Sequence, residues 1–149
     1  MSQDQSAREL RELVGEFEEA FAGIPEELSS EARSAGKWSR KQILGHLIDS
    51  AANNHQRFIR LQQEAELRLP GYEQEAWVRL NGYAERPWKD LVMLWAAYNR
   101  HLAHVIERIG VESLKHVWDN GSERHELGFL AADYVVHLRH HLEQIVAGG

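Results

Sequence analysis

The chain has 149 residues, a length that fits one domain with a single core. Lys and Arg number 17 against 23 Asp and Glu, and the formal net charge of -6 argues against nucleic acid as a partner, because such binding needs a basic surface. The absence of Cys excludes disulfides, thiolate metal ligands and a cysteine nucleophile. We find neither a signal-peptide pattern in residues 1–10 nor an apolar run near membrane-spanning length. We therefore expect a cytoplasmic protein without a membrane partner.

Helical spacing of apolar residues predicts a first helix over about residues 6–21. A second helix is expected over about residues 40–63, because Ser39 and Gln42 have the spacing of a capping box. A short helix over about residues 73–83 follows.

A long helix is then expected to open near Pro87 and to end at Gly110, a plausible C-cap. The last helix is predicted over about residues 126–146. Between these two, residues 119–121 form a turn signal, and residues 117–118 could be a short extended piece. Four long helices and one short one, with no convincing strand pattern, predict an all-α bundle. The tryptophans of the middle segments are expected in its core: Trp77, Trp88 and Trp95.

Polar residues lie beside the apolar stripe of the second helix, which suggests a lined cavity. At about 100° per residue, His46, Ser50, Asn53 and Arg57 share one flank of that stripe. Arg57 could hold an anionic group of a substrate, or it could form a salt bridge to a neighbouring helix. Asn53 is a second candidate substrate contact.

A histidine pair on the last helix indicates a metal site. His137 and His141 are four residues apart, so their Cβ atoms lie about 5–6 Å from each other on one helix face. That face includes the apolar stripe, so we expect the pair to point along the buried seam. His46 offers a third imidazole from another helix. Three neutral imidazoles leave a coordination position for water or substrate, as in catalytic sites, and suit zinc or nickel, with iron and manganese also compatible.

The pair is not the H-E-x-x-H signature of metalloproteases, because Leu138 stands where that signature has its Glu. Asp133, four residues before His137, could orient its ring by accepting a hydrogen bond, or it could be an ordinary surface carboxylate.

The other histidines carry weaker signals. His140 is expected in solvent, and the pair at positions 101 and 104 mostly on the surface. His55, His116 and His125 have no partner at a useful spacing.

Two stretches resemble the DinB-like (DinB/YfiT-like) superfamily of metalloenzymes, which is unrelated to the DNA polymerase of the same name. Residues 38–50, WSRKQILGHLIDS, continuing to Phe58, resemble its second-helix motif, and residues 133–145, DYVVHLRHHLEQI, resemble its C-terminal metal helix. The middle section, residues 69–88, is also similar, so the resemblance covers nearly the whole chain.

This resemblance implies an up-down-down-up four-helix bundle with an extra short helix, and a homodimer. It implies nickel or zinc held by the same three residues that spacing singled out, His46, His137 and His141. Relatives in this superfamily include S-transferases that use bacillithiol, mycothiol or glutathione, and a mycothiol-dependent maleylpyruvate isomerase.

The leading hypothesis is therefore a metal-dependent S-transferase whose partners are a low-molecular-weight thiol and an electrophile, with the metal keeping the sulfur as thiolate. A metal-dependent hydrolase that uses a metal-bound water is the second hypothesis. A non-catalytic, stress-linked metal-binding bundle is the third. A nucleic-acid-binding effector of the damage response fits the charge least well.

Overall fold

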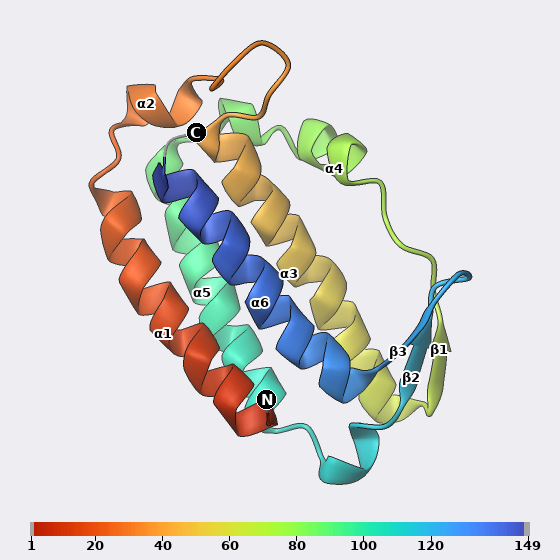
Figure 1. The fold of residues 1–149 in the computed structure, drawn as a ribbon. Helices are drawn as coiled ribbons and strands as arrows, with labels where there is room; N and C mark the ends of the chain where they lie inside the picture. Colours follow the sequence, from red (N-terminus) through yellow and green to blue (C-terminus); the bar gives the residue numbers. More distant parts are fainter. Residues whose placement is uncertain (1, 148–149) are drawn as a thin grey trace.

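Four long helices run side by side in the computed structural model, which describes residues 2–147. They are α1 (Gln3–Ala22), α3 (Arg40–Gln63), α5 (Trp88–Glu107) and α6 (Leu127–Ala147). Helices α1 and α3 each pack against both α5 and α6. The chain runs up α1, down α3 and α5, and up α6, so the expected up-down-down-up bundle is confirmed (Figure 1).

Capping boxes set the starts of the first two long helices. The Ser39 hydroxyl accepts from the Gln42 backbone N–H, and the Gln42 side chain accepts from the Ser39 backbone N–H, as predicted. Ser2 and Gln5 form the same motif, so α1 begins before residue 6, where the apolar spacing starts. Helix α5 ends at Glu107 with Arg108 as its C-cap, so the prediction of a cap at Gly110 was wrong.

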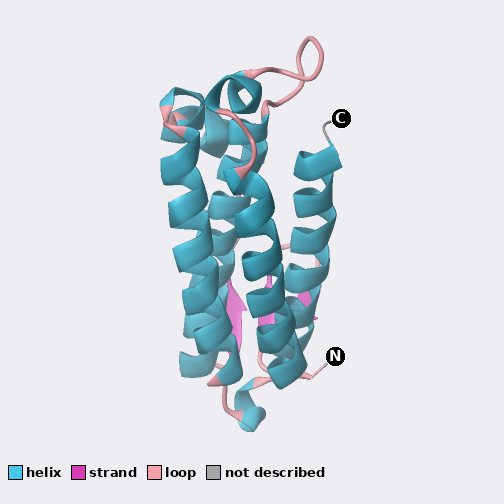
Figure 2. Ribbon diagram, turned by 90° about the vertical axis from the view of Figure 1, so that its left-hand side faces the viewer, coloured by secondary structure: helices cyan, strands magenta, loops and turns pink. Residues whose placement is uncertain are grey.

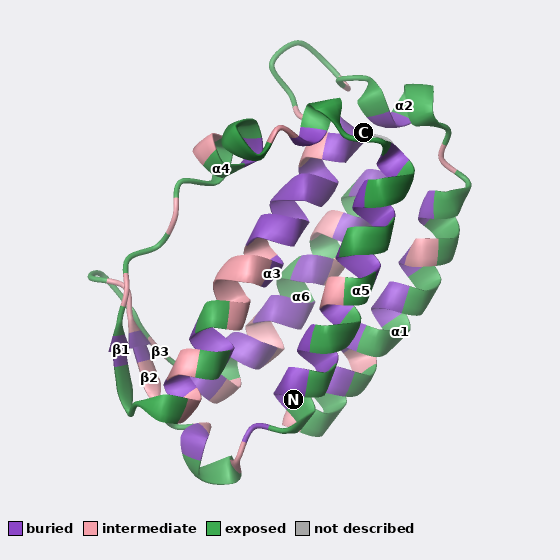
Figure 3. Cartoon of the chain, turned by 180° about the vertical axis from the view of Figure 1, so that it is seen from behind, coloured by how far each residue is buried: buried purple, intermediate pink, exposed green. Residues whose placement is uncertain are grey.

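An aromatic cluster fills the core between α1 and α5. Phe21 lies 5.5 Å, ring centre to ring centre, from both Trp88 and Trp95, and the two tryptophans are buried as expected. Buried positions lie on the facing sides of the four helices (Figure 3). Trp77 departs from the prediction: it is 37% exposed and packs against Tyr72 outside the core.

Because α3 and α5 run in the same direction, the chain between them must return along the full length of the bundle. This crossover contains β1 (Glu66–Arg68), α4 (Gln74–Asn81) and a 3₁₀ turn, η1 (Tyr83–Glu85). Asp49 of α3 fixes it there, accepting hydrogen bonds from the Tyr83 hydroxyl at 2.6 Å and the Asn81 amide at 2.9 Å. Gly45 leaves space for the Tyr83 ring.

The sequence patterns did not predict a small sheet that lies at one end of the bundle (Figure 2). Strand β2 (Val117–Asp119) pairs in parallel with β1 and antiparallel with β3 (Arg124–Glu126), and Trp118 stands opposite both Leu67 and His125. Each strand has three residues, too few to give a period-2 pattern. The extended piece at residues 117–118 and the turn at 119–121 were foreseen.

Two further short elements, α2 (Glu26–Ser30) and η2 (Val111–Ser113), complete the described chain. Over residues 2–147, no helix is both long enough and apolar enough to cross a membrane.

Candidate functional site

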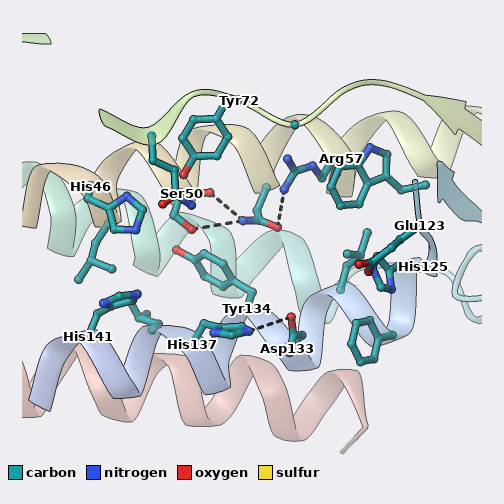
Figure 4. A pocket seen from close by; sticks show the side chains of 18 residues that line it. His46, Ser50, Arg57, Tyr72, Glu123, His125, Asp133, Tyr134, His137 and His141 are labelled. Carbon is teal, nitrogen blue, oxygen red and sulfur yellow. Dashed lines mark hydrogen bonds and ion pairs between the residues drawn. The ribbon is translucent and has the colours of Figure 1, made fainter. Parts of the chain in front are cut away.

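A pocket of about 590 Å³ lies between α3 and α6, a size typical of sites for small molecules. The crossover and the β2–β3 hairpin supply the rest of its wall (Figure 4). Because α3 and α6 are antiparallel, His46 of α3 faces His141 of α6 at one end, and Arg57 of α3 lies at the other (Figure 4). Arg57 comes eleven positions after His46, which returns the two residues to the same helix face about 16 Å apart along the axis.

His46 is held between two rings at the first end. Its imidazole lies 5.3 Å from the Trp38 ring and 5.3 Å from the His141 ring, and the residue is only 6% exposed. Burial, and then the neighbouring His141, lower the pKa of His46 from 6.5 to about 4. The imidazole is therefore neutral at pH 7, the form that binds metals. Its Nδ1 atom is buried without a hydrogen-bond partner.

His141 is half-buried and edge-on to His46, with an angle of 83° between the ring planes. Burial is the main cause that lowers its pKa. Its Nδ1 lies 3.3 Å from the Gln144 side-chain oxygen, an acceptor, so Nδ1 is the protonated nitrogen and Nε2 keeps its lone pair. The prediction that two distant segments bring imidazoles together holds for this pair.

His137 takes a different position from the one expected. Its side chain is 69% exposed, so the expectation that it points along the buried seam was wrong. The helix places it on the pocket side, but the ring turns toward Asp133, whose Oδ2 lies 3.3 Å from Nε2 (Figure 4). Within residues 2–147, no three His, Asp or Glu side chains converge well enough to hold a metal as they stand.

Arg57, at the far end, is 7% exposed and has no carboxylate partner within residues 2–147. Its guanidinium lies 3.9 Å from the centre of the Trp118 ring, and Nη1 donates to Asn54 Oδ1 at 3.3 Å. Its Nε is buried and unpartnered. Burial lowers the pKa of Arg57. The salt bridge considered as the alternative role for this residue does not form.

Asn53, the second expected substrate contact, does not line the pocket. Its side-chain amide donates to the Asp49 carbonyl at 2.9 Å. The neighbouring Asn54 lines the pocket instead, and its amide donates to the Ser50 carbonyl at 2.9 Å, so its oxygen faces Arg57.

Loops and strands contribute pocket residues that the sequence patterns do not indicate: Tyr72, Trp118, Glu123 and His125. His125 seemed to lack a partner, yet its Nε2 lies 2.8 Å from Glu123 Oε2 and its ring stacks on Phe129. The turn at residues 119–121 was the available signal, because a hairpin there returns His125 to Trp118.

The other histidines lie outside this pocket. His140 is exposed, as expected. His55 acquires a partner that spacing within one helix could not reveal: its Nδ1 lies 2.8 Å from the Tyr98 hydroxyl of α5.

An antiparallel helix pair that brings histidines to one end of a pocket, inside an up-down-down-up bundle, defines a helical-bundle protein with a candidate metal centre. Residues 9–145 match the model of the DinB superfamily, and the chain belongs to that superfamily. Among solved structures, YfiT from Bacillus subtilis is similar, with a TM-score of 0.88 at 20% identity over 98% of this chain and 85% of that one. That protein is described as a probable metal-dependent hydrolase with an unusual four-helix bundle topology. No curated protein matches the chain.

Proposed function

We propose that the chain is a metal-dependent enzyme, and specifically an S-transferase for a low-molecular-weight thiol. The proposal rests on the meeting of His46 and His141, from different helices, at one end of a pocket large enough for a small molecule. Both imidazoles have pKa values lowered by burial and offer neutral nitrogens to a cation.

The residues fit a divalent ion, nickel or zinc. His46 and His141 would hold it, and His137, one turn from His141, would be the third ligand. The exposed His137 ring has room to turn, and its contact with Asp133 uses Nε2, which would leave Nδ1 for the ion. The buried Nδ1 of His46 also has no hydrogen-bond partner among residues 2–147.

A bound ion at this site would lower the pKa of a coordinated thiol, so that thiolate exists at neutral pH. The protein's own groups then have to hold the nucleophile and the electrophile. Trp38 fixes the His46 ring from one side, and Gln144 fixes the tautomer of His141. Asp133 is suited to orient His137.

The state of the pocket carboxylates is compatible with transfer of a thiol. The pocket is lined by two of them, and each is paired with a histidine: Asp133 with His137, and Glu123 with His125. Attack by a preformed thiolate needs no general base, so neither carboxylate has to be free for it.

A metal-dependent hydrolase is the second candidate. It is supported by the likeness to YfiT, which is described as a probable enzyme of that kind.

A direct test loads the chelator-treated protein with zinc or nickel and measures turnover of monochlorobimane with bacillithiol, glutathione, mycothiol and coenzyme A. The same samples are tested on activated esters and amides. Metal-dependent S-transfer that disappears in His141→Ala supports the proposal. Ester or amide hydrolysis without S-transfer would favour the second candidate. Metal binding without either reaction would contradict both candidates and favour a non-catalytic metal-binding bundle.

A further inference from the structure

We propose that the Arg57 end of the pocket is an anion subsite that binds a carboxylate or phosphate on the distal part of an elongated substrate. The reacting part of that substrate would lie at the histidine end of the pocket. This placement of the reacting part rests on the proposed function. The anion subsite itself uses no metal ligand, so it can be tested in the metal-free protein.

The first argument is the unbalanced charge. A guanidinium stays protonated in proteins, and burying such a charge without an opposite charge is costly. Arg57 is 93% buried, yet among the described residues it has no acidic partner. Its cation rests on the face of Trp118, which offsets part of that cost. A ligand anion would supply the missing negative charge.

The second argument is the geometry of the donors. The guanidinium lies over the Trp118 ring, and among residues 2–147 its one hydrogen bond is from Nη1 to Asn54. Asn54 is itself fixed by its bond to the Ser50 carbonyl. Nε is buried without an acceptor, and Nη2 donates no hydrogen bond among residues 2–147. The Nε–Nη2 edge of the planar fork therefore lacks an acceptor, and a carboxylate or phosphate that reaches it could supply two.

The third argument is that the neighbouring carboxylate does not compete for Arg57. Glu123 also lines this end of the pocket, but its Oε2 lies 2.8 Å from His125 Nε2. Its side chain is 67% exposed, so its charge is largely screened by solvent.

The length of the pocket indicates the shape of the ligand. His46 and Arg57 face the same side of α3, about 16 Å apart along its axis. A substrate that spans both ends must be elongated, with its anionic group many bonds from the reacting atom. Long thiols whose carboxylate or phosphate is many bonds from the sulfur have this form, whereas short thiols do not.

The test follows the Arg57 Nε–H signal by NMR in chelator-treated protein labelled with ¹⁵N-arginine, during titration with succinate or inorganic phosphate at constant ionic strength. Succinamide serves as the uncharged control, and Arg57→Lys assigns the signal. We expect saturable shifts with at least one of the two anions and none with succinamide. Binding of phosphate alone or of succinate alone identifies the anionic group. Absence of saturation with both would overturn the inference, and it would do so in unaltered protein.

Variants provide the second arm. Arg57→Gln is expected to weaken binding of the anion by at least tenfold in calorimetry. Arg60→Gln is the matched control, because Arg60 lies on the same helix, is 42% exposed and only approaches Glu64. Equal loss in both variants, or in neither, would contradict the subsite. If the anion binds but zinc and nickel do not, the proposed function fails while the subsite stands.

Discussion

Replacing Gly45 with Ala should separate the crossover from α3. A Cβ at this position would lie 2.1 Å from Cδ2 and 2.3 Å from Cγ of Tyr83. Carbon atoms in contact are normally about 3.5–4.0 Å apart, so the ring must move by more than about 1 Å. The Tyr83 hydroxyl would then leave Asp49, which it now contacts at 2.6 Å.

The expected size follows from three effects. Overpacking of a filled site costs about 1–3 kcal/mol. Loss of a hydrogen bond to a carboxylate costs about 1.5–3 kcal/mol. The better helix propensity of Ala offsets about 0.5–1 kcal/mol of these costs. The free energy of unfolding should therefore fall by about 2–5 kcal/mol.

Urea unfolding of the chelator-treated protein measures this change, and Gly15→Ala in α1 is the matched control. Gly15 is also helical, but nothing lies within 4 Å of the added Cβ, so the same substitution should stabilise by about 0.5–1 kcal/mol. In a Tyr83→Ala background, the cost of Gly45→Ala should disappear. Equal effects at the two glycines, or an undiminished cost without the Tyr83 ring, would refute this account of the crossover.

Three further predictions concern the helices and the histidines. The pKa of His46 is about 4 when folded and about 6.5 when unfolded, so the unfolded chain takes up the proton first as the pH falls. The free energy of unfolding of the metal-free protein should therefore decrease by up to about 3 kcal/mol between about pH 6.5 and 4. Urea titrations should show a shallower decrease with falling pH in His46→Gln. If the two proteins lose stability equally over this pH range, His46 is not the cause of the decrease. Ser39→Ala removes the capping box of α3 and should cost about 1 kcal/mol by the same assay, whereas Ser122→Ala in an exposed turn should change stability by less than about 0.5 kcal/mol. Asp133→Asn should weaken metal binding by about tenfold or more if Asp133 orients His137. Unchanged metal affinity in calorimetry would show that Asp133 is an ordinary surface carboxylate.

The bundle could be predicted because its signals are local. Apolar spacing and the Ser39–Gln42 box identify α3 within a residue of its observed limits. The four long helices then leave few ways to bury their apolar faces. The small sheet could not be predicted, because its three-residue strands depend on pairing between residues far apart in the chain, such as Leu67 with Trp118.

The candidate site was predictable only where it depends on helix geometry. Positions on a helical wheel bring His46 and Arg57 to one face of α3 and place His141 opposite, as the structure has them. A wheel gives the direction of the Cβ atom but not the side-chain rotamer, which is why the turn of His137 toward Asp133 was missed. The contact of Arg57 with Trp118 was also missed, because Trp118 comes from the sheet.

The most direct test of the central claim is calorimetric titration of zinc and nickel into chelator-treated protein, comparing the unaltered chain with His46→Ala, His141→Ala and His140→Ala. His140 is the control because it is adjacent to His141 but exposed and outside the pocket. We predict one ion per chain for the unaltered protein and for His140→Ala, and a loss of at least tenfold in affinity for the other two variants. Unchanged binding in His46→Ala and His141→Ala, or no binding to the unaltered chain, would contradict a metal centre built between α3 and α6.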